Sequence, residues 1–172
     1  MGIRFCYFSC EQERITPGLV ENGPLALDFV GGPEPMVTLG RLGEQLTGIS
    51  FLEIGEAVRS WHREIDVPDD PVERAVFFDD YGLDPQAPPD ELEQALLELS
   101  WTVSVGQVDD RMRDALAAVP PDGGRSVAER WMTIEELDGW SSEEAQGVLE
   151  GLCEVARQAV ANGHHLYCWT ML

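Results

Sequence analysis

The firmest pattern in the chain is a helical stripe of apolar residues close to the C-terminal end. Apolar side chains recur at i, i+3, i+4 and i+7 over residues 145–159, and this period predicts one long amphipathic helix. Ser141 and Glu144 have the spacing of a capping box at its start, and Asn-Gly at 162–163 supplies a left-handed stop. HHLYCWTML, at 164–172, then predicts a closing strand.

A second apolar and aromatic segment, residues 2–10, predicts a strand at the other end of the chain. Both end segments are apolar on each face, as the central strands of sheets are, so we expect them to lie side by side. LALDFV, at 25–30, predicts a further strand, because Gly and Pro residues follow it and cannot continue a ladder.

The middle of the chain mixes short helical and short strand patterns. Thr38 has the position of an N-cap for a helix that ends at Gly48, and ISFLEI at 49–54 predicts a strand. Apolar residues at helical spacing over 57–65 predict a helix that carries His62.

Loops rich in Pro and Asp separate the elements that follow. DVPDDP at 66–71 is a loop by composition, and the pattern at 74–82 fits either a strand or a short helix. An apolar stripe over 90–100 predicts a helix, the alternation at 101–105 predicts a strand, and apolar residues within 112–119 predict another helix.

Together these elements predict a single α+β domain over residues 1–172. We expect a mixed or antiparallel sheet with the N- and C-terminal strands close together, packed by several helices that include the long C-terminal one. A chain of 172 residues fits one domain, and 44% hydrophobic residues supply its core.

The charge is strongly acidic, with 32 acidic residues against 11 basic ones, all of them Arg, and a net charge of −21. Residues 1–86 carry −10 and residues 87–172 carry −11, so the charge is spread evenly between the halves. Such a field repels phosphates and anionic lipids, so we expect no binding to nucleic acid or membrane. Two interpretations stay open: a solvated surface that maintains solubility, and a negative face that attracts a basic partner protein.

The sequence also indicates in which cellular compartment the protein is expected. The chain holds no apolar run of the roughly 18 residues that a membrane span needs. Its start has a short apolar stretch but neither the h-region nor the cleavage site of a signal peptide. We therefore expect a cytoplasmic protein.

The two terminal segments hold the main cluster of residues that can bind metal. On a strand Cys6 and Cys10 share one face, and so do His164 and Cys168. If the strands pair, these four side chains form a candidate Cys3His site. Against it, structural zinc sites favour a C-x2-C knuckle, and cysteine is also a common buried apolar residue. We expect no metal and no other cofactor.

Catalytic candidates are weak, and the catalytic residues stay unassigned. A Cys168–His164 dyad would place a nucleophile near a base, but residues i and i+4 on a strand lie about 13 Å apart. Asp79 and Asp80 follow the apolar run AVFF, where carboxylates can hold Mg²⁺, yet no phosphate-binding motif accompanies them. Trp131 and Trp140 flank a short helix predicted from a capping box at 133–136, and are candidate partner-binding residues.

Four short motifs resemble the YfbM-like family of small bacterial proteins of uncharacterised function. They are the MGI start, LTG at 46–48, DPVERAV at 70–76 and NGHHLYCW at 162–169, in that order. The resemblance implies an α+β fold and says little about activity, because a fold does not fix a function.

Two classes of function stay open from the sequence. The first is a non-enzymatic, acidic bacterial interaction protein, for example an immunity-type protein that binds a basic protein partner. The acidic charge, the single domain and the lack of a catalytic set favour it. The second is a small enzyme of unrecognised type that uses a carboxylate or Cys/His site.

Overall fold

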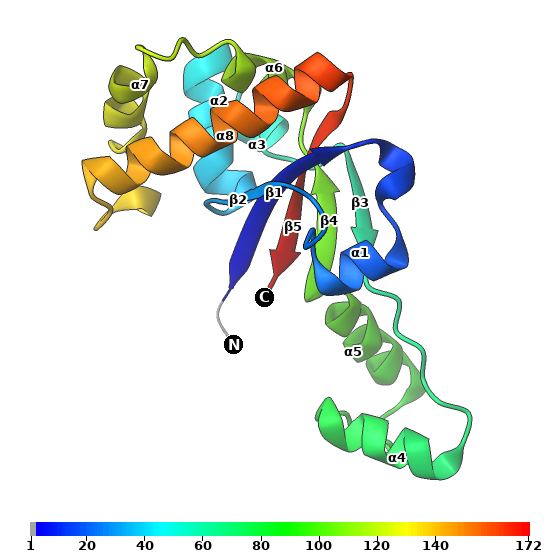
Figure 1. The fold of residues 1–172 in the computed structure, drawn as a ribbon. Helices are drawn as coiled ribbons and strands as arrows, with labels where there is room; N and C mark the ends of the chain where they lie inside the picture. Colours follow the sequence, from blue (N-terminus) through cyan, green and yellow to red (C-terminus); the bar gives the residue numbers. More distant parts are fainter. Residues whose placement is uncertain (1–2) are drawn as a thin grey trace.

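The structure, a computed structural model, describes residues 3–172, and five strands within them form one antiparallel sheet (Figure 1). The strand order is β2-β1-β5-β4-β3, and every neighbouring pair is antiparallel. The strands are β1 (Arg4–Cys10), β2 (Phe29–Gly31), β3 (Arg59–His62), β4 (Val103–Gln107) and β5 (His165–Met171).

Eight α-helices lie in the connections between the strands of the described chain. They are α1 (Pro17–Asn22), α2 (Gly40–Thr47), α3 (Phe51–Ile54), α4 (Pro71–Asp80), α5 (Pro89–Trp101), α6 (Asp110–Ala117), α7 (Gly124–Trp131) and α8 (Ser142–Asn162). Short 3-10 turns occur at Gln12–Arg14 and Glu135–Leu137, and a π-helical turn at Pro35–Leu39 leads into α2. The predicted single-domain α+β fold is confirmed. None of the helices between residues 3 and 172 combines the length and the apolar character that a bilayer crossing requires.

The predicted pairing of the two end strands is confirmed. β1 and β5 pair over seven residues, from Arg4 opposite Met171 to Cys10 opposite His165. Because β5 also pairs with β4 on its other side, both of its backbone edges are satisfied. The predicted strand at 2–10 begins at Arg4, and Gly2 lies outside the described residues.

Both faces of this sheet are covered, which explains why its central strands are apolar throughout. Tyr7 lies opposite Cys168, and both belong to the core under α8, α2, α6 and α7. Phe8 lies opposite Tyr167, and both belong to a second core beside α1. Figure 1 shows α8 lying across the sheet with α2, α6 and α7 beside it.

The predicted long helix and both of its ends are confirmed in α8. The Ser141 hydroxyl accepts a hydrogen bond from the Glu144 N–H at 3.2 Å, and the Glu144 carboxylate accepts one from the Ser141 N–H at 2.8 Å. Gly163 ends the helix with φ of 69°, a conformation that glycine adopts without strain. Where α8 crosses β2 the packing is close, since a Cβ at Gly151 would lie 2.5 Å from Val30.

Two predicted elements between 49 and 65 are wrong in type. ISFLEI forms the short helix α3, in which the N–H groups of Glu53 and Ile54 donate to the Ser50 carbonyl. The predicted helix at 57–65 is instead strand β3, so His62 lies on a strand. The cause is tertiary: β3 pairs with β4, and the Trp61 ring packs edge-on against Tyr167.

Four further local predictions can be compared with the hydrogen bonds that the structure shows. Residues 25–28 form a turn, and only the end of the predicted strand pairs in β2. Glu34 rather than Thr38 caps the helical segment, because its carboxylate accepts from three backbone N–H groups. The predicted capping box at 133–136 is absent, since the Thr133 hydroxyl donates to the Arg130 carbonyl and a 3-10 turn follows. The ambiguous segment at 74–82 is helical, in α4.

The capping box gives a direct test of what starts α8. We expect Ser141→Ala to lower the free energy of unfolding by about 1 kcal/mol, because the Glu144 N–H loses its acceptor. Ser142→Ala, one residue into the helix, is the matched control and leaves stability within about 0.5 kcal/mol. Urea unfolding followed by circular dichroism measures both, and equal stability of the two variants would contradict the role of the box.

Candidate functional site

The feature that departs most from a simple sheet is a helical arm, residues 63–102, which joins β3 to β4. These strands are antiparallel neighbours, with His62 opposite Ser104, so a short turn would connect them. The arm instead carries α4 and α5. Figure 1 shows both helices standing away from the end of the sheet, apart from the layer formed by α8, α2, α6 and α7.

Local sequence explains why the arm is helical. Asp70 caps α4, and its carboxylate accepts from the N–H groups of Val72 at 2.9 Å and Glu73 at 3.0 Å. Pro71 and Pro89 occupy first-turn positions of α4 and α5, where the missing N–H costs nothing. In α4 the buried side chain is Phe78, and no side chain of α5 reaches the same degree of burial.

The arm is tied to the body at its root by Arg63. Its guanidinium donates to the Thr102 hydroxyl at 2.8 Å and lies 3.5 Å from the Glu21 carboxylate of α1. It also donates to the Leu99 carbonyl at the end of α5 and lies 6.0 Å from the Tyr81 ring at the end of α4. One half-buried cation thus contacts both arm helices and the body.

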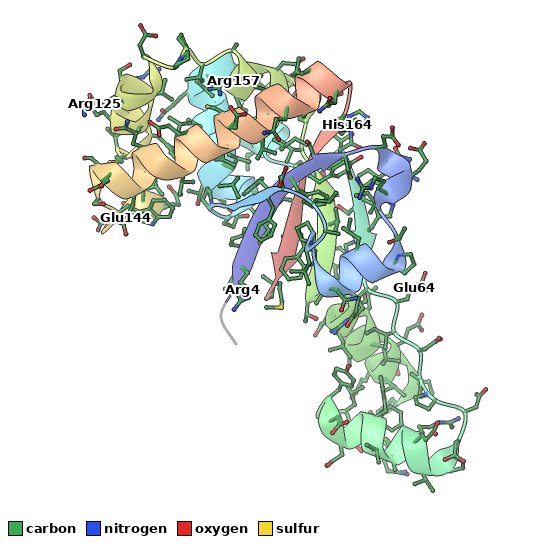
Figure 2. All side chains as sticks on the ribbon, viewed as in Figure 1. Arg4, Glu64, Arg125, Glu144, Arg157 and His164 are labelled. Carbon is green, nitrogen blue, oxygen red and sulfur yellow. The ribbon has the colours of Figure 1, made fainter. Side chains whose placement is uncertain are left out.

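The arm concentrates the negative charge of the protein. Residues 63–102 hold twelve acidic residues and two arginines, a net charge of −10 out of −21. Both arginines bond within the protein: Arg63 at the root, and Arg74 to the carbonyls of Pro68 and Asp69. The even split between the two halves of the sequence is therefore not an even split in space. Figure 2 shows the side chains of this arm, with Glu64 labelled where it begins.

The same arm exposes large apolar side chains. On α5, Leu97 is 51% exposed and Trp101 is 56% exposed, and with Gln94 and Glu98 they line a hollow of about 300 Å³. The Trp101 ring stacks on His62, with ring centres 4.8 Å apart. Val72 and Val76 of α4 are also exposed. Exposed apolar groups within a strongly acidic surface are typical of a protein-binding site.

The structure does not bring the four candidate metal ligands together. Cys6 and Cys10 lie on the sheet face that carries α1, whereas Cys168 lies on the face under α8. The physical reason is the register: Cys168 stands opposite Tyr7, and residue 7 points away from residues 6 and 10. His164 lies just before β5, where its carbonyl accepts from Arg113. Across residues 3–172, no three His, Cys, Asp or Glu side chains come close enough to hold a metal ion.

The thiols are also not activated as nucleophiles. Burial raises the pKa of Cys168 to about 12 and the pKa of Cys10 to about 11, so both stay protonated at neutral pH. The Cys168 sulfur lies near the Trp169 carbonyl and the Thr170 hydroxyl, and no bond joins it to His164. The predicted weakness of the Cys168–His164 pair follows from the strand geometry.

A polar cluster that the sequence did not suggest lies at the start of β5. The His165 ring is 2.9 Å from Asp110, which also pairs with Arg113 at 2.9 Å. Cys10 stands opposite His165 in the ladder but makes no hydrogen bond to it among the described contacts. Because Asp110 is 55 residues from His165, no spacing in the sequence could reveal this pair.

The remaining sequence candidates are in places that do not favour their predicted roles. Asp79 and Asp80 are exposed at the end of α4, not at the end of a strand. Trp131 is fully buried, with its indole N–H bonded to the Thr38 carbonyl at 3.0 Å, so it presents no surface to a partner. Trp140 is half-buried and packs edge-on against Trp131. The exposed tryptophan of α5, Trp101, is the one that sequence reasoning missed.

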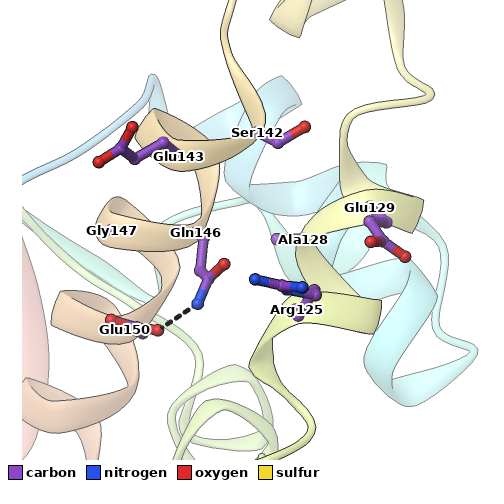
Figure 3. A pocket seen from close by; sticks show the side chains of 8 residues that line it. All are labelled: Arg125, Ala128, Glu129, Ser142, Glu143, Gln146, Gly147 and Glu150. Carbon is purple, nitrogen blue, oxygen red and sulfur yellow. Dashed lines mark hydrogen bonds between the residues drawn. The ribbon is translucent and has the colours of Figure 1, made fainter.

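A polar groove of about 730 Å³ runs between α7 and α8 (Figure 3). Figure 3 shows Arg125 of α7 reaching toward Gln146 of α8, whose amide donates to Glu150 at 2.8 Å. Glu129 and Glu143 also line it. The groove is open, and its lining mixes acidic and basic side chains. Its lining residues point to no particular ligand or reaction.

No model of a known protein family, no curated protein and no solved structure matches the chain. The resemblance to the YfbM-like family stays a prediction. The candidate functional site is therefore the arm, on the evidence of its own charge and exposure.

The anchoring role of Arg63 can be tested by proteolysis. We expect Arg63→Met to increase cleavage within 64–69 by about tenfold or more, because hydrogen bonds to a charged group are worth about 1.5–3 kcal/mol and local opening rises accordingly. Arg157→Met is the control, since Arg157 is partly exposed and pairs only with Glu154 within α8, far from the arm. Mass spectrometry of timed digests locates the cuts, and equal rates in both variants would show that Arg63 does not hold the arm.

The burial of the thiols predicts how they react. In the native protein at pH 8 we expect Cys6 alone to react readily with a thiol reagent, since it is half-buried while the other three are buried. Cys6→Ser should abolish the fast reaction, and Cys153→Ala should leave it unchanged. All remaining thiols should react once the chain is unfolded in denaturant. Fast native labelling of Cys10 or Cys168, located by mass spectrometry, would contradict the burial of these thiols.

Proposed function

We propose that this chain is a non-enzymatic interaction protein that binds a basic protein partner through its helical arm. The observation that carries the proposal is the combination, on one projecting element, of net charge −10 with exposed Leu97 and Trp101. The charge attracts a basic partner over a distance, and the apolar groups supply the area that is buried on contact.

The rest of the molecule supports this proposal more than it supports an enzyme. Burial holds the thiols of Cys10 and Cys168 protonated, and Asp79 and Asp80 lie in solvent. A small enzyme would need a nucleophile or base within reach of a pocket. The arm projects from the sheet and keeps Leu97 and Trp101 exposed, as a docking element does (Figure 1).

The proposal predicts capture of basic proteins that depends on the arm. The experiment compares the immobilised wild-type chain with an arm variant, Asp79→Asn, Asp80→Asn and Glu93→Gln, in a native lysate at low salt. We expect wild type to retain a basic protein and the arm variant to retain about tenfold less of it, because three charges are removed from the attracting surface. Elution should occur as salt is raised, since the Debye length falls from about 10 Å at 0.1 M to about 3 Å at 1 M.

A body variant with the same change in charge is the control. Glu129→Gln, Glu136→Gln and Glu143→Gln also remove three exposed charges, from α7, the 3-10 turn and α8. This variant should retain the partner nearly as well as wild type. Equal losses in both variants would mean that net charge alone attracts the retained protein, and retention of acidic proteins would refute the proposal.

A further inference from the structure

We infer that the outer face of α5 docks a basic amphipathic helix of the partner, with one large apolar side chain of that helix seated between Leu97 and Trp101. This inference rests on the proposed function and specifies which face of the arm makes contact and what form of partner it fits.

The residues of this face form a single stripe along α5. Leu97 and Glu98 lie three and four residues after Gln94, and Trp101 lies four and three residues after them, so the four side chains share one face of the helix. A stripe of this kind matches the ridge of a second helix laid alongside it, with anchors at i, i+3, i+4 and i+7. The hollow that they line, about 300 Å³, is at the lower limit of small-molecule pockets and suits one side chain.

The apolar end of the stripe is held in place before any partner arrives. The Trp101 ring lies nearly parallel to the His62 ring, at 17° between planes, and the next residue, Thr102, accepts from the Leu172 N–H at 2.9 Å. A fixed aromatic group loses little entropy on binding, which is why such groups act as interface anchors. His62 belongs to β3, so the sheet itself orients this anchor.

The acidic end of the stripe sets the charge of the partner. Asp90 and Glu91 occupy the first turn of α5, on the same side as Gln94 one turn later. Trp101 lies ten positions after Glu91, which is about 15 Å along a helix. The matching helix therefore carries its apolar anchor about two to three turns from its Lys or Arg residues.

Charge also excludes the other occupants of this face. A second copy of the chain would bring two arms of −10 together, and like charges at a contact oppose binding. An anionic membrane or a nucleic acid would be repelled for the same reason. A basic amphipathic helix can neutralise the acidic side chains of the stripe and also cover Leu97 and Trp101.

Two synthetic peptides of leucine and lysine test the inference with the full chain. One has an order that gives a single apolar face when helical, and the other has the same composition in scrambled order. We expect the amphipathic peptide to bind wild type about tenfold or more tightly than the scrambled one, in fluorescence-anisotropy titrations at low salt. Leu97→Ser and Trp101→Ser should each weaken its binding by about tenfold.

Controls separate this docking from general attraction to the arm. Leu25→Ser alters an apolar residue that is 79% exposed but lies outside the arm, and it should leave binding unchanged. Equal affinity for the two peptides, with basic-protein capture that persists in Leu97→Ser, would overturn the helix docking and leave the proposed function intact. A wild-type dimer that Trp101→Ser converts to a monomer would also overturn it, by identifying a second copy as the occupant.

Discussion

The pairing of β1 with β5 is the constraint on which the rest of the structure depends. It joins the two ends of the described chain over seven residues and makes β5 a central strand between β1 and β4. Because side chains alternate along this ladder, every second residue enters the core under α8 and the others enter the core beside α1. The same alternation separates Cys168 from Cys6 and Cys10. One register therefore decides both how the cores fill and why the thiols do not meet.

The arm is the part of the molecule that this constraint does not require. β3 and β4 pair whether two residues or forty connect them, since lengthening a surface loop costs little free energy. Arg63 fastens the arm with one charged group that contacts α1, α4 and α5. The arm carries about half of the net charge and keeps Leu97 and Trp101 in solvent. An element that adds so little to the core and exposes so much is the part of the molecule to which we assign the proposed binding role.

Sequence reasoning succeeded where a local pattern is long and lies on one face. The stripe of α8, the capping box at Ser141 and the two terminal strands all carry their signals within a few neighbouring residues. It failed at β3 and α3, which are four residues each, because a short apolar run fits both periods. Pairing with β4 selects the strand at β3, and α3 instead packs against α2. It also named Trp131 as a candidate partner-binding residue, whereas Trp131 is fully buried and its indole N–H bonds to the Thr38 carbonyl. The candidate site was missed for a related reason. The net charge was counted for residues 1–86 and 87–172, and this division splits the arm, residues 63–102, between the two counts.

The sequence by itself determined the class of the fold, the adjacency of the end strands and the acidic character of the surface. These follow from hydrophobic period, caps and composition, which are properties of the chain before it folds. The tertiary structure alone decided the sheet register, the separation of the thiols, the pairing of His165 with Asp110 and the projection of the arm with Trp101 exposed. Each of these depends on residues far apart in the chain, and no local pattern records which of them will meet.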